Sequence, residues 1–355
     1  MKLVIQLPCL NEREQLAQTL ADLPRHIDGI DEIEVLVVDD GSTDGTSQRA
    51  AELGVHHIVR FPEHRGLAAA FMAGVDAAMR LGADVIVNTD ADNQYRGVDV
   101  ARIVAPILLG RADVVIGDRQ IEASPHFSPA KRVLQRWGSA LVRRLSGTAV
   151  GDATSGFRAF SRRAACRLFV HSRFTYTLET IIHGGRSGLV FEDVTLTTNP
   201  KRRDSRLFRS IPHYLRRGVP VLFRAYVMYQ PVQAFAFVAA ALFVCGAVLE
   251  SRFFYYYLTN PLYSGHQQSL VVGVGCTIVS FLVALFAILS DLLAANRRLL
   301  EELLGRVRRL DGRLARETRE NGEGVDDVQS TGAAPWRAER EVDRARSAWG
   351  GTRGR

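Results

Sequence analysis

Cysteine is scarce in this chain, and the cysteines present show no paired spacing. The 355 residues contain 4 cysteines, at positions 9, 166, 245 and 276. Such isolated residues predict neither a disulfide framework nor a structural zinc site. The first residues also lack a basic region followed by a long apolar stretch, so we expect no cleavable signal peptide.

Charged side chains are almost missing from two stretches in the second half of the chain. Val232–Leu249 and Leu270–Leu289 are nearly continuous apolar runs, each within the roughly 17 to 25 residues that a membrane-spanning helix needs. The aromatic stretch Glu250–Ser269 separates them, and basic residues flank the pair on both outer sides. By the positive-inside rule we expect a two-helix transmembrane hairpin with both termini in the cytoplasm.

Acidic residues are rare just before the first apolar run, although the whole chain carries a formal net charge of +7. Lys201–Arg224 is rich in arginine, with Asp204 as its acid. Such a patch can bind anionic lipid headgroups or the phosphate of a substrate. We do not expect a nucleic-acid partner, because the patch adjoins an apolar run and carries no nucleic-acid motif.

The first 215 residues alternate between short apolar runs and helical patterns. The predicted strands are Leu3–Leu7, Val35–Val38, His57–Val59, Val85–Asn88, Val114–Ile116 and Val190–Val194, and the predicted helices include Arg13–Leu23, Ser47–Leu53 and Leu67–Leu81. This alternation predicts an α/β domain with a mostly parallel sheet, whose ligands bind beyond the carboxyl ends of the strands.

Acidic side chains stand where two of these strands end. Asp90 and Asp92 follow the Val85 strand with one residue between them, so an extended backbone directs both carboxylates to one face. Two such carboxylates suit a hard divalent cation. The run Val35–Asp44 repeats the arrangement with a glycine turn. Solvated acids in a turn are the alternative interpretation.

The region after Asp291 has a different period. Apolar residues and one asparagine recur in alternating steps of about three and four along residues 293–314, which is an a/d heptad pattern. It predicts a coiled coil and hence a homo-oligomer, or alternatively an amphipathic helix lying on the membrane. We therefore expect a cytosolic domain over 1–215, a basic juxtamembrane segment over 216–230, two transmembrane helices over 231–295, an amphipathic or coiled-coil helix over 296–320 and a disordered tail over 321–355.

Several motifs occur together in the first half of the chain. They are LPCLNE at Leu7–Glu12, VVDDGSTDGT at Val37–Thr46, RGLA at Arg65–Ala68, TDADNQ at Thr89–Gln94 and TSGFRAF at Thr154–Phe160. In this order they resemble the family 2 glycosyltransferases, and more narrowly the dolichyl- or polyprenyl-phosphate sugar synthases. The resemblance implies a GT-A-type nucleotide-sugar-binding domain followed by the transmembrane hairpin.

The resemblance also implies roles for individual residues. Mg²⁺ or Mn²⁺ would be held by Asp90, Asp92 and Gln94, and the nucleotide sugar would contact Pro8, Leu10, Glu12, Asp40, Asp90, Ala91, Asp92, Gln94 and Arg119. A metal in this place would neutralise the charge of the departing diphosphate. Arg119 would clamp phosphate oxygens, and Asp92, Asp152 and Arg119 are the candidate catalytic residues. The acceptor phosphate would meet Lys131, Arg132, Arg136, Arg202, Arg203 and Arg206, each of which is alternatively a surface or lipid-binding cation.

The role of Asp152 depends on the acceptor. A hydroxyl acceptor must lose its proton during attack and needs a base, whereas a phosphate acceptor is already ionised. We expect an inverting transfer from a nucleotide sugar, a uridine donor in preference to GDP-mannose, to polyprenyl phosphate at the cytoplasmic membrane face. The alternatives are a transferase acting on a hydroxyl of a glycolipid or cell-wall glycan, and a membrane scaffold that binds nucleotide sugar without turnover.

Overall fold

The computed structural model describes residues 1–119, 138–140, 142–170, 176–199, 226–227, 231–259 and 267–320. The chain divides into two compact units. Unit 1 comprises Met1–Ile211 together with Leu304–Arg355, and unit 2 comprises Pro212–Leu303. The basic stretch at 201–224 and the tail at 321–355 lie outside the described residues.

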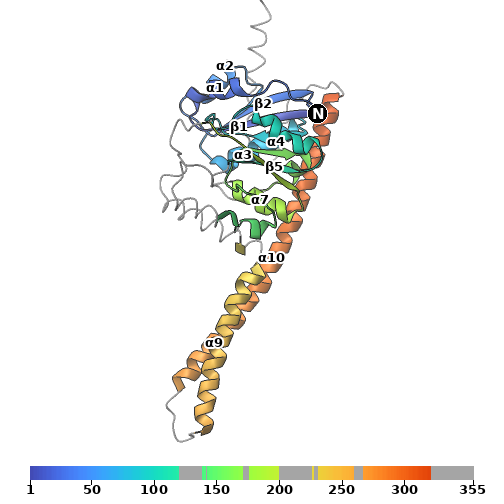
Figure 1. Ribbon diagram of the computed structural model, residues 1–355. Coiled ribbons are helices and arrows are strands. Elements are labelled where there is room, and N and C mark those ends of the chain that lie inside the picture. Colours follow the sequence, from blue (N-terminus) through green and yellow to red (C-terminus); the bar gives the residue numbers. More distant parts are fainter. Residues whose placement is uncertain are drawn as a thin grey trace, which may run out of the picture. The chain divides into compact units, whose positions relative to one another are not determined.

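A seven-stranded sheet forms the centre of unit 1, with the strand order β3-β2-β1-β4-β6-β5-β7 (Figure 1). The strands are β1 (Lys2–Cys9), β2 (Glu32–Asp39), β3 (His57–Arg60), β4 (Val85–Asn88), β5 (Val114–Asp118), β6 (Arg158–Ser161) and β7 (Phe191–Thr195). Only β6 runs antiparallel to its neighbours β4 and β5, whereas the other pairs are parallel. The predicted α/β class with a mostly parallel sheet is confirmed.

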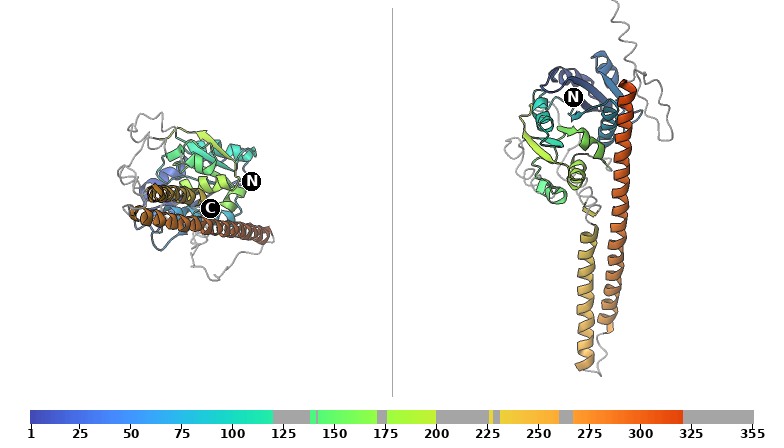
Figure 2. Two further views of the ribbon diagram at one scale, coloured as in Figure 1. Left: turned by 90° about the horizontal axis from the view of Figure 1, so that it is seen from below. Right: turned by 90° about the vertical axis from the view of Figure 1, so that its right-hand side faces the viewer.

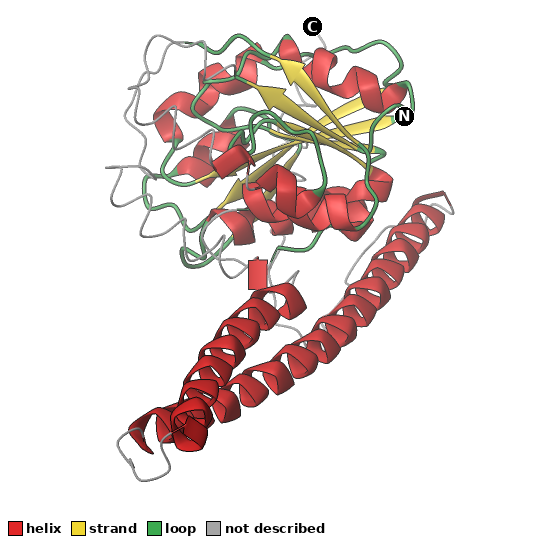
Figure 3. Cartoon of the chain, turned by 60° about the horizontal axis from the view of Figure 1, so that its bottom comes forward, coloured by secondary structure: helices red, strands yellow, loops and turns green. Residues whose placement is uncertain are grey.

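Helices cover both faces of this sheet (Figure 3). They are α1 (Arg13–Asp22), α2 (Thr46–Glu52), α3 (Leu67–Arg80), α4 (Asp99–Leu108), α6 (Arg162–Arg167) and α7 (Thr177–Arg186). On one face, Leu3 and Ile5 of β1 join Leu16 of α1 and Ile103 of α4 in the main apolar core. On the other face Gln6 meets Gly74 of α3 so closely that a Cβ there would lie 2.3 Å from its Oε1. Because both faces are covered, the strands are apolar along their length rather than alternating.

The strand directions bring the predicted motifs to one edge of the sheet. β1, β2, β4 and β5 point the same way, so the residues that follow them meet at their carboxyl ends. β6 runs the opposite way, so its amino end, and the segment that precedes Arg158, lie at this same edge. The single reversed strand thus adds the TSGF segment to the acidic edge.

Unit 2 contains both predicted apolar runs, in α9 (Pro231–Thr259) and in the first part of α10 (Gln267–Glu320), whose residues from Leu304 onward belong to unit 1. Their apolar windows have mean hydropathies of 2.3 and 2.6 and are only 11% and 17% buried, so both helices are long and apolar enough to cross a membrane. The two helices lie side by side (Figure 2), joined by hydrogen bonds from Ser280 Oγ to the Ala239 carbonyl and from Thr277 Oγ1 to Glu250 Oε1, each 2.9 Å. Small residues at Gly246 and Gly273 permit this approach.

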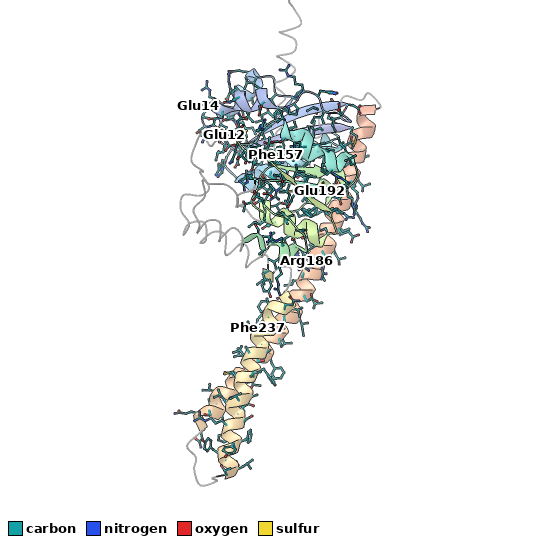
Figure 4. All side chains as sticks on the ribbon, in the orientation of Figure 1. Glu12, Glu14, Phe157, Arg186, Glu192 and Phe237 are labelled. Carbon is teal, nitrogen blue, oxygen red and sulfur yellow. The ribbon has the colours of Figure 1, made fainter. Side chains whose placement is uncertain are left out.

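The helices are longer than the sequence pattern indicated. The stretch expected to connect the spans, Glu250–Ser269, is helical up to Thr259 and again from Gln267. Residues 296–320, for which a helix was predicted, are helical and belong to α10, which runs unbroken to Glu320. Figure 4 shows side chains such as Phe237 projecting outward from α9, and Phe237 is 78% exposed.

Candidate active site

Asp90 forms the centre of the acidic edge. It follows β4 and faces Gly156, where a Cβ would lie 3.1 Å from both Asp90 carboxylate oxygens. The pKa of Asp90 is raised to about 7, chiefly by burial and also by the negative charges of Asp92 and Glu12, while the positive charge of Arg119 acts in the opposite direction. Keeping such a buried carboxylate ionised calls for a cation beside it.

The residues at this edge fit a divalent ion that takes only a few of its ligands from the protein. Asp90 and Asp92 offer carboxylate oxygens, and the Asp92 Oδ1 accepts a hydrogen bond from the Gln94 backbone at 3.1 Å. Within the described part of the chain, no group of three or more His, Cys, Asp or Glu residues could hold a metal. Two carboxylates would leave coordination positions for water and for phosphate oxygens, which is the usual arrangement for Mg²⁺. The Gln94 side chain as a third ligand stays a prediction.

Gly156 is held from both sides by buried side chains. Its N–H donates to Tyr95 Oη at 3.3 Å, and its carbonyl accepts from Tyr176 Oη at 3.1 Å and from Asn88 Nδ2 at 2.8 Å. Asn88 in turn accepts from Gln6 Nε2 at 2.8 Å. This network fixes the segment against which Asp90 lies. The sequence interpretation missed these positioning residues, although an asparagine at the end of an apolar strand was a usable signal.

Tyr176 and Arg158 also stabilise the segment that contains Gly156. The Tyr176 ring stacks on Phe71 with centroids 3.9 Å apart. Arg158 is fully buried, and its guanidinium donates to the carbonyls of Ala153 at 3.0 Å and Ser155 at 2.8 Å. Burial lowers the pKa of Arg158 to about 10. The arginine of the TSGFR motif is therefore a structural brace for the loop rather than a group open to substrate.

Arg119 and Asp152 form a two-point ion pair beside the acidic edge. Arg119 Nε lies 2.7 Å from Asp152 Oδ2 and Nη2 lies 3.1 Å from Oδ1. Thr154 adds its N–H and hydroxyl to Oδ1 at 3.1 Å and 2.9 Å. Burial alone would raise the pKa of Asp152, but the Arg119 charge and these hydrogen bonds hold it below its ordinary value. Asp152 is consequently a poor proton acceptor.

Asp40 and the residues after β1 lie at the neighbouring strand ends. The buried Asp40 carboxylate accepts from the backbone N–H groups of Arg65 at 2.7 Å and Gly66 at 2.9 Å, and His64 Nδ1 lies 2.8 Å away. Asp40 thus fixes the turn that opens α3. Its predicted contact with the nucleotide sugar stays a prediction, and a ligand there would share the Asp40 carboxylate with the N–H groups of this turn.

The loops after β1 and β2 are tied to each other. Asn11, in a left-handed conformation with φ 55°, accepts from the Thr43 N–H at 2.9 Å and donates its own N–H to Ser42 Oγ at 2.9 Å. Glu12 donates its N–H to Thr46 Oγ1 at 3.0 Å. Pro8, Leu10 and Glu12 are each partly exposed beside these loops, as a binding slot requires.

The structure brings five of the predicted site residues together. Glu12, Asp90, Asp92 and Arg119 interact electrostatically, and Arg119 links them to Asp152. Glu12 and Phe157 are labelled in Figure 4, in the part of unit 1 that carries the site. The predicted acceptor-phosphate residues Lys131, Arg132, Arg136, Arg202, Arg203 and Arg206 all lie outside the described residues.

Comparison with known proteins agrees with this geometry. Residues 4–169 match the domain described as glycosyl transferase family 2. An uncharacterized protein of Methanocaldococcus jannaschii is 31% identical over 202 residues, which are 56% of this chain and 81% of the relative. The chain belongs to glycosyl transferase family 2. The matched residues include most of β1, the strands β2 to β6 and the acidic edge after β4.

Two further likenesses extend the comparison. The undecaprenyl-phosphate mannosyltransferase of Micrococcus luteus is 34% identical over 166 residues, which are 45% of this chain and 66% of the relative. The crystal structure of glucosyl-3-phosphoglycerate synthase from Mycobacterium tuberculosis in complex with UDP superimposes with a TM-score of 0.50 and 24% identity, covering 63% of this chain and 79% of that chain. The second likeness shows the GT-A-like fold of this family 2 member.

Proposed function

We propose that this glycosyltransferase moves a sugar from a nucleotide-sugar donor to a polyprenyl phosphate at the cytoplasmic face of a membrane. The Arg119–Asp152 ion pair carries the proposal. The ion pair lowers the pKa of the Asp152 carboxylate, which a hydroxyl acceptor would need as its base. A phosphate acceptor is already ionised at neutral pH and needs no base. The undecaprenyl-phosphate mannosyltransferase relative acts, by its name, on such a lipid.

The reaction would be a single in-line displacement. An oxygen of the acceptor phosphate attacks the anomeric carbon of the sugar, the bond from that carbon to the donor diphosphate breaks, and the nucleoside diphosphate leaves with the electron pair. Attack opposite the leaving group inverts the anomeric configuration. The protein contributes mainly position and charge, because no proton has to move.

The residues at the edge divide this work. Asp90 and Asp92 would hold Mg²⁺ or Mn²⁺, which when bound neutralises charge on the leaving diphosphate. Arg119 sits between this pair and Asp152, so it can place positive charge near the phosphates while Asp152 fixes its direction. The Asn88, Tyr95 and Tyr176 network holds the floor under Asp90.

The two apolar helices support a membrane-bound acceptor. α9 and α10 would keep the enzyme in the bilayer that holds the lipid, and the basic flanks support a cytoplasmic location of both termini. We expect a uridine-linked donor, with a guanosine-linked sugar as the other candidate. The hydroxyl-acceptor alternative would require Asp152 to act as a base despite its lowered pKa.

A transfer assay tests the proposal. Membranes containing the full chain are given polyprenyl phosphate, Mn²⁺ and labelled uridine- or guanosine-linked sugars, and lipid-linked sugar is extracted and counted. We expect product that disappears with a chelator and with Asp90→Asn but persists with Asp28→Asn, a fully exposed acid. Failure with every donor, or transfer only to a hydroxyl acceptor, would overturn it. Any metal-dependent turnover excludes the scaffold alternative.

A further inference from the structure

One face of α10 carries exposed apolar side chains in a strict heptad. Positions a hold Leu293, Leu300, Val307 and Leu314, and positions d hold Asn296, Leu303 and Leu310. The leucines and the valine of this set, called the α10 stripe below, are 51% to 60% exposed. A stripe of this period is the packing surface of a left-handed coiled coil.

The opposite face of the same helix is already occupied by the catalytic domain of its own chain. Gly305 at position f is buried, and a Cβ there would lie 3.2 Å from the Cys166 carbonyl. Arg308 at position b lies 3.1 Å from Asp76 of α3 and donates to the Leu168 carbonyl at 2.5 Å. Its guanidinium also covers the Phe169 ring at 4.6 Å. All these residues belong to unit 1.

This docking determines where the stripe faces. Positions f and b lie across the helix from positions a and d, because successive residues turn by about 100°. The contacts of Gly305 and Arg308 therefore hold the helix with Val307 and Leu310 directed away from the domain. The catalytic domain of the same chain therefore leaves Val307 and Leu310 of the α10 stripe uncovered.

A second copy fits the stripe better than a lipid surface does. α10 is one helix from Gln267 to Glu320, so the stripe continues the apolar span past Asp291 and Arg298 without the break that a helix turning flat onto the membrane would need. Copies inserted in one bilayer share one orientation, which makes their helices parallel.

The residues at positions g and e are compatible with a parallel pair of helices. In such a pair position g faces position e five residues further along the partner. Leu299 would meet Leu304, both apolar and 60% and 50% exposed. Position 306 is arginine and position 311 is aspartate, which are complementary charges. Asn296 at a d position supplies one polar layer within the otherwise apolar stripe.

We propose that residues 293–314 of α10 form a parallel coiled coil with the same segment of a second copy of this chain. The catalytic domain would then be held on the outer face of each helix through Arg308. The assembly would set two sites side by side on one membrane surface. This inference is independent of the proposed function, since none of its residues belongs to the site.

Disulfide trapping in membranes tests it. Cys245 and Cys276 are first replaced by serine, and a single cysteine is then introduced by Leu303→Cys or Leu310→Cys, with Arg309→Cys as the exposed control at position c. We expect oxidation to give a product of twice the chain mass for both d-position variants and little for the control. In a parallel pair each d position meets itself, whereas an antiparallel pair would not link both.

The contrary outcomes are equally definite. Equal linking of all three variants, or linking of neither d-position variant, would overturn the proposal. Labelling with a water-soluble maleimide then shows what covers the stripe instead. If the Leu303→Cys variant is labelled but not cross-linked, this face of the helix is exposed to water. If it is neither labelled nor cross-linked, lipid covers the face. Glycosyl transfer by the same membranes provides the check that each variant is folded.

Discussion

Arg119 donates two hydrogen bonds to Asp152, with Nε 2.7 Å from Oδ2 and Nη2 3.1 Å from Oδ1. The pair joins the end of β5 to the loop before β6, and it lies beside the carboxylates that follow β4. The Asp152 carboxylate, a candidate catalytic group in the sequence, therefore orients the Arg119 guanidinium. Under the proposed function, the central task of this site is to place charge rather than to abstract a proton.

Replacing Asp152 distinguishes the two acceptor classes. Asp152→Asn keeps the shape but removes the charge that orients Arg119, so we expect kcat to fall by about 10- to 100-fold through misplacement. The pH profile of kcat should keep its wild-type shape, because no proton transfer is lost. Steady-state assays from pH 6 to 9 measure both quantities. Near-complete loss of activity, together with the disappearance of a wild-type pH-dependent limb, would instead identify Asp152 as a base.

Replacing Asp90 should separate stability from activity. Asp90→Asn removes a buried charge that lies near Asp92 and Glu12, so the metal-free protein should unfold at the same temperature as the wild type or higher. Activity with Mn²⁺ should drop by about 100-fold or more, and the stabilisation that Mn²⁺ gives the wild type should vanish. Thermal unfolding of the detergent-solubilised chain with and without Mn²⁺ measures this. A variant that is still stabilised by Mn²⁺ would place the metal elsewhere.

Adding a methyl group at Gly156 tests whether the close contact between this glycine and Asp90 positions the carboxylate. The new Cβ would lie 3.1 Å from both Asp90 oxygens and from Tyr176 Oη, so Gly156→Ala should displace the carboxylate. We expect metal affinity to weaken by about 10- to 100-fold, as for other groups that orient ligands. Titration of activity with Mn²⁺ reports the affinity. Gly138→Ala is the matched control, because its Cβ would meet nothing within 4 Å.

A partly buried charge cluster around Glu34 of β2 should make an acid-sensitive contribution to the stability of the fold. Glu34 Oε2 lies 2.8 Å from Lys2 Nζ and 3.0 Å from His57 Nε2. Burial opposes ionisation, yet the hydrogen bonds and charges of His57 and Lys2 lower the pKa of Glu34 to about 2. A pKa lowered on folding stabilises the native state above the unfolded value of 4.5, and this contribution is lost as pH falls toward 2.

Glu34→Gln should therefore lower the free energy of unfolding by about 1 kcal/mol at pH 5 to 6. The difference from wild type should shrink as the pH is lowered from 4.5 to 3. Thermal or denaturant unfolding over this range measures it. Glu32→Gln removes a 57% exposed acid 3.3 Å from the same lysine and should change stability less. A difference that stays constant with pH would contradict the assignment.

Local pattern predicted the elements that depend on neighbouring residues. The apolar run Val85–Asn88 was predicted with the bounds that β4 has, and parallel strands necessarily gather the acids that follow them. α4 and α7 were missed for a local reason. Pro106 interrupts the helical pattern of α4. Gly184 and Gly185 interrupt that of α7, and the structure needs glycine at these two positions because Phe191 and the Ser146 carbonyl pack against them.

Other features depend on residues far apart in the chain. β6 begins with a charged residue, Arg158, and becomes a strand only because β4 and β5 pair with it on either side. The Asn88, Tyr95 and Tyr176 contacts to Gly156 likewise join distant segments. No window of sequence contains both partners of such contacts.

The sequence by itself determined the α/β class, the acidic pair Asp90 and Asp92 at a strand end, the apolar spans and the heptad, since periodicity and composition are local properties. Only the tertiary structure decided that Asp152 is bound to Arg119 and that Gly305 and Arg308 attach α10 to its own domain. The physical reason is the same in both cases. A side chain's charge and direction depend on the partner that folding brings to it, and that partner stands many residues away.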